Sequence, residues 1–497
     1  MKKFIISTLS VLVLCLLVGC GETTVKPTET PTTNTNTEPL DEFWDADQNG
    51  IADWTEKEIT LTYATWQTHE DTMAETIDAM MINEFEKLYP NINIDMVFVS
   101  ESDGWQTALQ ALAETGSLPD VFLVNRLEST IAYNMLADIT EYYNHDSDTE
   151  YIFESLQQSG VYNGVRYAVP SFVYANWWFV NLDILSANGI EAPGYDWTWE
   201  QMEAIASACY DETTHTVGQS GYTEYWKTLP KAISKVSSWA SYTFDTETET
   251  FNFGSTAFET AITMMGNALN TNACTSPYSV DDILEYYGET VTEYALLNGY
   301  NIGFNGHSAI WASPSWTAKD YFSSMTFNWD VYPAPGGTIG GNTDIMGVSS
   351  TCANKAAAYQ FLKWMSYSEE GLKTRYDIYD KYGDILYIAA DNYPYPVADY
   401  LTNTEGVNEI WDNLPYTLVA GMTSSEMISA LKNGAFVLNK EIPGWDTVDQ
   451  TVNPYLYEVA NGTQQFAAVK ATIVSESDRV FKEFNDALKA KIQENLS

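Results

Sequence analysis

The sequence has few basic residues and few histidines, and each shortage excludes a class of function. Only 23 Lys and Arg residues oppose 68 Asp and Glu residues, which gives a formal net charge of −45 at pH 7. A surface of this sign repels nucleic acid and anionic ligands, and it is compatible with a neutral or cationic solute. The four histidines show no HExxH motif or other paired ligand spacing, so a zinc enzyme is not expected.

Cysteine is also scarce, with five residues in the chain. Two of them lie in the N-terminal apolar segment, and the other three, Cys209, Cys274 and Cys352, are far apart with no CxxC pair. This pattern excludes a disulfide framework and leaves open whether one disulfide forms. A GxSxG segment is missing as well, which removes the nucleophile elbow of many hydrolases.

Long apolar runs are confined to the N-terminus. Lys2 and Lys3 precede an apolar run over residues 4–18, which is short for a bilayer span and typical of a signal-peptide core. The run ends in LVGC at residues 17–20, which resembles a bacterial lipobox. The resemblance implies that residues 1–19 are removed and that Cys20 carries a lipid. We therefore expect a protein anchored by lipid to the extracytoplasmic face of the cell membrane.

Residues 21–40 are rich in Thr, Pro, Asn and Glu and contain almost no apolar side chains. A segment of this composition cannot bury enough surface to fold. We predict that residues 20–43 form a flexible tether between the lipid and the folded body.

Within the segment over residues 44–56, positions 45–56 match the twelve-residue calcium loop of the EF-hand. Hard oxygen ligands recur at alternate positions, and Gly50 allows the sharp turn that such a loop makes. No helix is expected before it, so the match concerns the loop and not a complete EF-hand. We predict a structural Ca²⁺ ion held by side chains of Asp45, Asp47, Asn49, Asp53 and Glu56 and by the backbone carbonyl of Ile51.

The body begins with alternating strand and helix patterns. Apolar periodicity predicts strands at 58–66, 91–99 and 119–124, with helices at 73–89 and 103–115 between them. This order is typical of an α/β fold with a parallel sheet, in which ligands bind beyond the carboxyl ends of the strands. The residues that follow these strands are Trp66, Gln67, Glu101, Asn125 and Arg126, and we predict that they line a ligand site.

Several later motifs occur in a recognisable order. The ordered residues are Asn163-Gly164, Tyr167, Pro170, Asn181, Asp183, Gly189, Pro193, Thr198-Trp199-Glu200, the segment 304–310 (FNGHSAI) and the segment 329–336 (WDVYPAPG). They resemble the corresponding motifs of the family 1 extracellular solute-binding proteins, which include maltose-binding protein.

That resemblance implies a two-lobed fold of the type II periplasmic-binding-protein class, with a hinge and a cleft between the lobes. The first lobe would comprise residues 57–168 and 346–405, and the second residues 169–342 and 406–497. It further implies a monomeric, non-enzymatic protein that captures a sugar or oligosaccharide by hinge closure. The loaded protein would then meet the permease subunits of an ABC importer.

A sugar presents a CH-rich face to aromatic rings and hydroxyl groups to polar side chains. Trp177 and Trp178 are neighbours in an extended segment and face opposite sides, so at most one should contact the ligand. Tyr225 and Trp226 lie where related proteins supply an aromatic from the second lobe. The remaining candidates are Trp311, Trp316, Asp344 and Trp411, of which Trp316 is preferred among the aromatics.

Three alternatives stay open at this point. An extracellular glycoside hydrolase needs two carboxylates about 5–10 Å apart, and a chain with 68 acidic residues can always supply a pair. A binding protein that serves a sensor would have the same sequence features as one that serves a transporter. The acidic surface also tolerates a peptide or amino-sugar ligand.

Overall fold

The computed structural model describes residues 41–66, 76–100, 104–276, 278–297, 301–317, 325–382, 394–400, 420–432, 436–438, 442 and 444–496. The signal peptide, Cys20 and all but the last three residues of the tether therefore lie outside the described residues. Of the helices within these ranges, none combines the length and apolarity that a bilayer crossing requires.

The first lobe starts with the predicted alternation of strands and helices. Its elements are β1 (Ile59–Ala64), α1 (Ile77–Leu88), β2 (Ile92–Met96), α2 (Trp105–Glu114) and β3 (Val121–Val124). Both β2 and β3 pair with β1 in parallel, as the pattern indicated. Every residue of the short strand β3 is buried, because helices cover both faces of a parallel sheet.

Two long strands connect the lobes. They are β6 (Ala168–Asn181) and β12 (Ile339–Val348), which pair antiparallel in a nine-stranded sheet with the main order β2-β1-β3-β12-β6-β10-β7. The boundaries predicted near residues 168 and 342–346 fall within these two strands. A hairpin of β4 (Val161–Tyr162) and β5 (Val165–Arg166) precedes β6, and positive φ angles at Asn163 and Gly164 form its turn.

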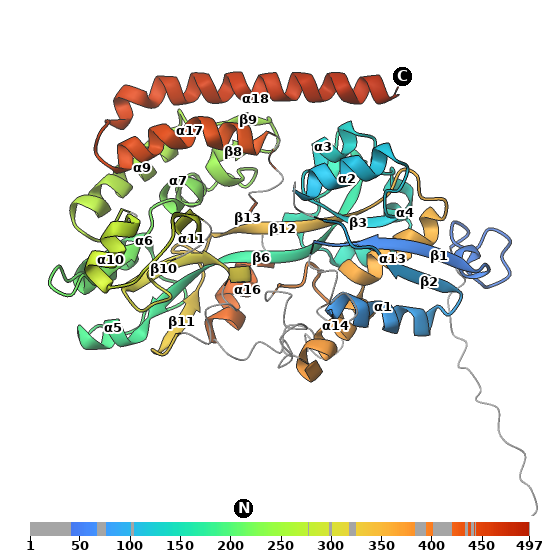
Figure 1. The fold of residues 1–497 in the computed structure, drawn as a ribbon, viewed down its shortest axis with the longest axis horizontal. Coiled ribbons are helices and arrows are strands. Elements are labelled where there is room, and N and C mark those ends of the chain that lie inside the picture. The colour runs from blue at the N-terminus through green and yellow to red at the C-terminus, as the bar shows by residue number, and fades with distance from the viewer. Residues whose placement is uncertain are drawn as a thin grey trace, which may run out of the picture.

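The second lobe surrounds the far end of β6 (Figure 1). Its helix α6 begins after Thr198, whose side chain accepts from the Gln201 amide in a capping box. Its elements are α5 (Leu182–Ala187), α6 (Trp199–Cys209), β7 (Val217–Ser220), α7 (Glu224–Lys227), α8 (Leu229–Ser234), η5 (Ser241–Thr243), β8 (Phe244–Asp245), β9 (Thr250–Phe251), α9 (Thr256–Asn270), α10 (Val280–Tyr287), α11 (Glu293–Leu297), β10 (Ser308–Pro314) and β11 (Trp329–Tyr332).

Further elements complete the first lobe and the region around the connecting strands, and a helical hairpin ends the chain. These elements are η1 (Asp53–Thr55), α3 (Leu127–Ala132), α4 (Thr140–Asn144), η3 (Ser147–Tyr151), η4 (Glu154–Leu156), α13 (Lys355–Ser366), α14 (Glu369–Tyr382), η7 (Ala420–Thr423), α16 (Ser425–Lys432), β13 (Phe436–Leu438), α17 (Trp445–Ala460) and α18 (Phe466–Leu496). In Figure 1, α18 lies across the top of both lobes.

The C-terminal region differs from the predicted division into lobes. Met427 and Leu431 of α16 join the core cluster that contains β1, and Ser155 Oγ donates to the Leu431 carbonyl oxygen at 3.0 Å. The last turns of α18 also reach the first lobe, where Ile492 packs against the cluster of Leu127 and Ile131. Sequence order alone could not reveal these returns of the chain, because they depend on the path between the lobes.

Two large apolar clusters stabilise the protein. One contains Tyr63, Phe85 and Phe361 of the first lobe and continues along the connecting strands to Phe179 and Trp311. The other, which we call the second-lobe core, includes Phe258 and Met265. Two polar pairs also lie inside the first lobe. In one of them Arg375 forms a 3.1 Å ion pair with Asp78, and both side chains are almost fully buried.

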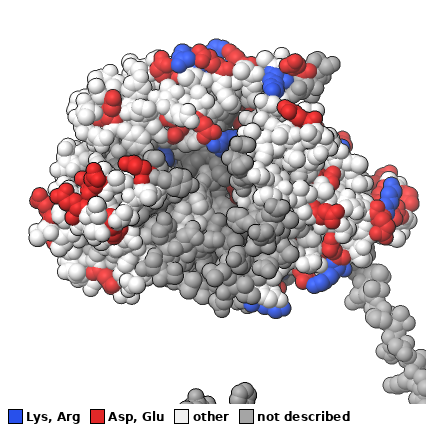
Figure 2. Space-filling model, in the orientation of Figure 1, with Lys and Arg blue, Asp and Glu red and all other residues white. Residues whose placement is uncertain are grey.

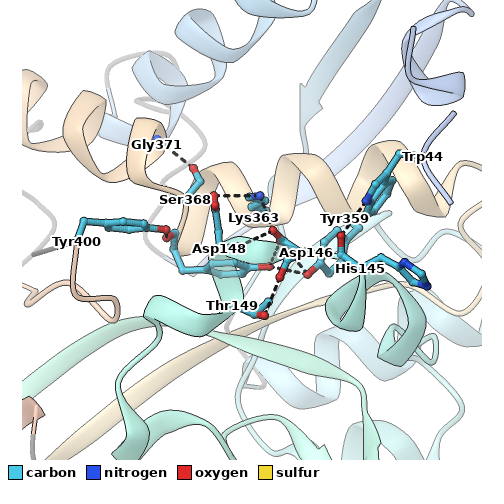
Figure 3. A network of polar contacts seen from close by, with 11 residues as sticks. Trp44, His145, Asp146, Asp148, Thr149, Tyr359, Lys363, Ser368, Gly371 and Tyr400 are labelled. Carbon is cyan, nitrogen blue, oxygen red and sulfur yellow. Dashed lines mark hydrogen bonds and ion pairs between the residues drawn. The ribbon is translucent and has the colours of Figure 1, made fainter. Parts of the chain in front are cut away.

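The second polar centre of the first lobe is the carboxylate of Asp146 (Figure 3). It accepts from Lys363 Nζ at 2.6 Å and from the hydroxyl groups of Tyr367 and Tyr359 at 2.7 and 3.2 Å. The N-terminal segment docks beside it, since Trp44 Nε1 donates to the carbonyl oxygen of His145 at 3.0 Å. The start of the predicted calcium loop is thus attached to the wall of the first lobe.

Cys209, Cys274 and Cys352 are buried and free, so no disulfide joins them. Burial raises the pKa of the Cys209 thiol to about 11, which keeps it in the unreactive protonated form. On the face shown in Figure 2, acidic side chains are spread over both lobes and are more widespread than basic ones.

Candidate ligand-binding site

The end of β3 places two predicted residues side by side. Val124 is paired with Ile345 of the antiparallel strand β12, so Asn125 continues the ladder beside Asp344. Asn125 is half-buried, and Asp344 is buried with 3% of its surface exposed. Although far apart in the chain, an amide and a carboxylate are therefore placed at neighbouring positions where the first lobe joins the connecting strands.

Tyr174 occupies the middle of the same surface. It lies directly opposite Asn342 in the β6–β12 ladder. On its other side Asn176 pairs with Pro314, so the continuation of β10 brings Trp316 opposite Tyr174. The two rings meet edge to face with centroids 5.7 Å apart, and Trp316 remains half-exposed.

These residues share one face of the connecting strands because side chains alternate along a strand. We call Asn125, Asp344, Asn342, Tyr174, Asn176 and Trp316 the hinge strip. It combines amide and carboxylate groups with two aromatic rings, which is the set of side chains that carbohydrate recognition requires.

The helix α7 of the second lobe approaches the strip at Gly340. A Cβ atom on Gly340 would lie 2.7 Å from Thr228 Cγ2, 3.3 Å from Asn176 Nδ2 and 3.6 Å from Glu224 Oε2. Only glycine leaves room for this approach, so Gly340 permits Glu224 to reach the connecting strands. Thr228 Oγ1 then donates to Glu224 Oε2 at 2.9 Å.

Burial raises the pKa of the Glu224 carboxyl, while the charge of Lys227 and the hydrogen bond from Thr228 oppose that rise. Glu224 has 7% of its surface exposed. A hydrogen bond from a hydroxyl group stabilises such a buried carboxyl group strongly, because little water is present to replace the donor. Sequence reasoning singled out the two aromatic neighbours of Glu224 and missed Glu224 itself.

Trp66 and Arg126 lie at the strand ends, as predicted. The Trp66 ring meets Trp105 edge to face with centroids 5.5 Å apart, and Trp66 is half-exposed. Arg126 Nε and Nη2 donate to the two carboxylate oxygens of Asp446 at 2.9 and 2.7 Å. The Arg126 guanidinium is therefore engaged by the second lobe in this arrangement.

Five predicted aromatic residues lie in cores and not on the hinge strip. The set consists of Trp177, Trp178, Tyr225, Trp226 and Trp311, each with 0% of its surface exposed. Trp311 stacks on Phe179 at 5.1 Å, and Trp177 Nε1 donates to the Tyr395 hydroxyl at 3.0 Å. A ring without an exposed face cannot stack on a sugar, so the structure assigns these side chains to packing.

Three other predicted residues, Gln67, Glu101 and Trp411, lie outside the described residues. Two open depressions in the described part, with volumes of about 410 and 240 Å³, lie elsewhere on the first lobe and contain none of the predicted ligand residues. Among the missed residues, Asn176 carried the only usable sequence signal, as an amide within a run of aromatic and apolar residues.

The predicted calcium loop is folded as a tight acidic turn. Carboxylate oxygens of Asp45, Asp47 and Asp53 lie within 4.8 Å of one another. The Asn49 side-chain amide donates to Asp47 at 3.1 Å and to Glu56 at 2.8 Å, and Gly50 adopts a φ of 84°. This hard oxygen donor set fits Ca²⁺.

The family of the chain follows from its match to a family model. Residues 70–371 match the model of the bacterial extracellular solute-binding proteins, which covers more than half of the chain. The chain belongs to this family. Members of the family are binding proteins, and the two-lobed arrangement around β6 and β12 is the fold that they share.

Several solved structures share the fold of this solute-binding protein. An ABC substrate-binding protein of Listeria monocytogenes, determined in complex with cycloalternan, is 22% identical with a TM-score of 0.59 over 86% of this chain and 100% of that chain. A cyclic α-maltosyl-1,6-maltose binding protein of Arthrobacter globiformis is 16% identical with a TM-score of 0.63 over 85% and 99%. A sugar-binding protein of Xanthomonas citri is 15% identical with a TM-score of 0.61 over 86% and 99%.

Proposed function

We propose that this protein is the substrate-binding component of an ABC importer and captures an uncharged sugar or oligosaccharide at the hinge strip. The sugar would lie on the strip beside α7, and closure of the lobes would complete its contacts. Carbohydrate ligands named for proteins of the same fold support this ligand class. The net charge of −45 is compatible with a neutral ligand.

The observation that carries the proposal is the half-exposed Trp316 against Tyr174, with Asn342 on the adjoining strand. An indole face supplies the apolar surface on which a sugar ring stacks. The amide and carboxylate groups beside it supply partners for the hydroxyl groups. Together these groups favour capture of a neutral sugar over a peptide.

The test is isothermal titration of the mature protein with a panel of neutral oligosaccharides, amino sugars and short peptides. For the sugar that binds, Trp316→Ala should lower affinity by about 10- to 100-fold, as expected for an aromatic anchor. Trp54→Ala is the matched control, because Trp54 packs against Tyr89 at the outer end of the first lobe. Equal affinities of wild type and Trp316→Ala would contradict the assignment of the site.

Product analysis separates binding from catalysis. Chromatography after prolonged incubation should recover the bound oligosaccharide uncut, since we expect capture without covalent chemistry. New reducing ends that accumulate with time would favour a glycoside hydrolase. Transport of the same sugar by a membrane preparation that contains the partner permease would distinguish an importer from a sensor.

We also propose that the loop 45–56 holds one structural Ca²⁺ ion. Asp45, Asp47 and Asp53 already converge, and Asn49 links Asp47 to Glu56 through its amide. The Ile51 carbonyl would complete the set of ligands predicted from the loop pattern. Bound calcium would fix the segment that Trp44 attaches to the first lobe.

Thermal unfolding with and without calcium tests this second proposal. Calcium at a hundredfold excess over its dissociation constant should add about 2.7 kcal/mol to the free energy of unfolding. Glu56→Gln should remove most of that gain, whereas Asp95→Asn on β2 should keep it. Unfolding temperatures that do not respond to calcium in the wild type would contradict the metal site.

Export and anchoring complete the proposal. The lipobox-like segment ending at Cys20 would attach the protein by lipid to the extracytoplasmic face of the membrane, and residues 20–43 would act as a tether. Metabolic labelling with a radioactive fatty acid tests this directly. Label should be incorporated into the wild type and lost in Cys20→Ala.

A further inference from the structure

The short helix α3 of the first lobe is held at both ends by the C-terminal helical hairpin. Arg126, which caps its start, forms the two hydrogen bonds with Asp446 in the first turn of α17. Tyr133, which follows its end, lies under the Lys491 ammonium group of α18 with 3.5 Å between nitrogen and ring centroid. One helix of the first lobe is thus held by two helices of the second.

The hairpin belongs to the second lobe by its packing. Val452 and Leu456 of α17 and Ile473 and Phe481 of α18 are part of the second-lobe core. Only the end of α18 leaves that core, where Ile492 packs against the cluster of the first lobe. A helix of 31 residues is about 46 Å long, which is enough to cross from one lobe to the other (Figure 1).

Charged groups line the same contact. Glu128 in the first turn of α3 has 6% of its surface exposed. Glu249, in the turn between β8 and β9 of the second lobe, lies 3.9 Å from Lys489 Nζ on α18 and contributes to the electrostatic environment of Glu128. The contact is therefore partly polar, which is typical of surfaces that separate and rejoin.

We propose that α17 and α18 form a clasp on α3 that holds the two lobes together in the closed arrangement. This inference rests on the proposed hinge closure and adds a structural element that sets its equilibrium. Arg126 adjoins Asn125 of the hinge strip, so the clasp joins the lobes at the edge of the ligand site. Opening of the lobes about β6 and β12 must separate Arg126 from Asp446 and Tyr133 from Lys491.

Distances between the lobes in the ligand-free protein test the clasp. Spin labels at Leu88→Cys on α1 and Leu284→Cys on α10 would report the separation, since both positions are exposed and the native thiols of the body are buried. Asp446→Ala should increase the population with the longer distance about two- to fivefold, the range that one partly exposed ion pair supports. Asp446→Ala combined with Lys491→Ala should increase it further.

Two controls make the result specific. Lys470→Ala removes an ion pair with Glu259 that lies within the second lobe, so it should leave the distances unchanged. Asp446→Glu keeps the charge and should restore most of the shorter distance. Identical distance distributions for the wild type and the double variant would overturn the clasp.

The measurement uses no sugar, so its failure would leave the proposed ligand untouched. Conversely, a failure of every sugar to bind would leave the distance result standing. The two inferences are therefore tested separately.

Discussion

Trp316 meets the edge of Tyr174 with ring centroids 5.7 Å apart, while Trp311, five residues earlier, stacks on Phe179 in the core. The two tryptophans lie on one short stretch of chain, yet one is half-exposed and the other fully buried. Their position relative to the end of β10 makes this difference, because the strand packs on the sheet and the chain beyond it reaches the hinge strip.

This contrast predicts different consequences of the same substitution. Trp311→Ala should lower the free energy of unfolding by about 3–5 kcal/mol, because it leaves a cavity in the core. Trp316→Ala should cost about 1 kcal/mol or less, since a half-exposed ring loses fewer contacts. Denaturant unfolding of both variants measures the difference, and equal losses would contradict the placement of the two rings.

A side chain added at Gly340 should disturb the candidate site sterically. Gly340→Ala would bring its methyl group to 2.7 Å from Thr228 Cγ2, so α7 must move away from the connecting strands. Overpacking of this kind costs about 1–3 kcal/mol of stability, and the displaced Glu224 should weaken ligand binding. Gly266→Ala in α9, where the added methyl meets no atom within 4 Å, should be neutral or slightly stabilising. Calorimetric unfolding and titration of the two variants provide the comparison.

The free energy of unfolding should depend strongly on Lys363, the cationic partner of Asp146. Lys363→Met leaves a carboxylate buried with only its tyrosine and backbone donors, and it should lower the free energy of unfolding by about 3–5 kcal/mol. Lys363→Met combined with Asp146→Asn removes the unpaired charge and should recover part of that loss. A double variant as unstable as the sum of the single variants would contradict this account.

The buried carboxyl group of Glu128 should make the stability of the protein depend on pH. Burial raises its pKa to about 7, with a smaller contribution from the charge of Glu249, while Arg126 opposes the rise. Because the pKa in the folded state lies above that of an unfolded glutamate, the stabilisation is complete below about pH 4 and is lost as the pH rises through 7. Chemical unfolding between pH 4 and pH 8.5 measures this loss.

Replacement of the carboxyl group isolates its contribution. Glu128→Gln should gain stability relative to the wild type as the pH rises, since a buried amide cannot ionise beside the carboxylate of Glu249. Glu285→Gln, at an exposed position of α10, should follow the wild type throughout. Parallel curves for Glu128→Gln and the wild type would show that Glu128 ionises normally.

Local patterns predicted much of the first lobe. Apolar periodicity located β1, α1, β2 and β3. The strand ends were predicted too, so the positions of Trp66, Asn125 and Arg126 just beyond them were expected, and their role in binding stays a prediction. These features depend on neighbours within a few residues, which the sequence displays directly.

The aromatic residues show where such reasoning fails. Trp177 and Trp178 face opposite sides of β6, as period-two alternation requires, but a different core covers each side. No local pattern distinguishes a ring that fills a core from a ring that lines a cleft. Likewise, Glu224 gained its place only because Gly340, on a distant strand, lets α7 approach.

By itself, the sequence determined the α/β pattern, the acidic surface, the calcium-type loop and the resemblance to a binding-protein family. Each of these depends only on composition or on the spacing of residues that are close in the chain. Only the tertiary structure decided which tryptophan remains exposed, which polar groups meet at β6 and β12, and that α18 returns to the first lobe. Those outcomes depend on contacts between segments far apart in the chain, whose register is set by the packing of the whole sheet.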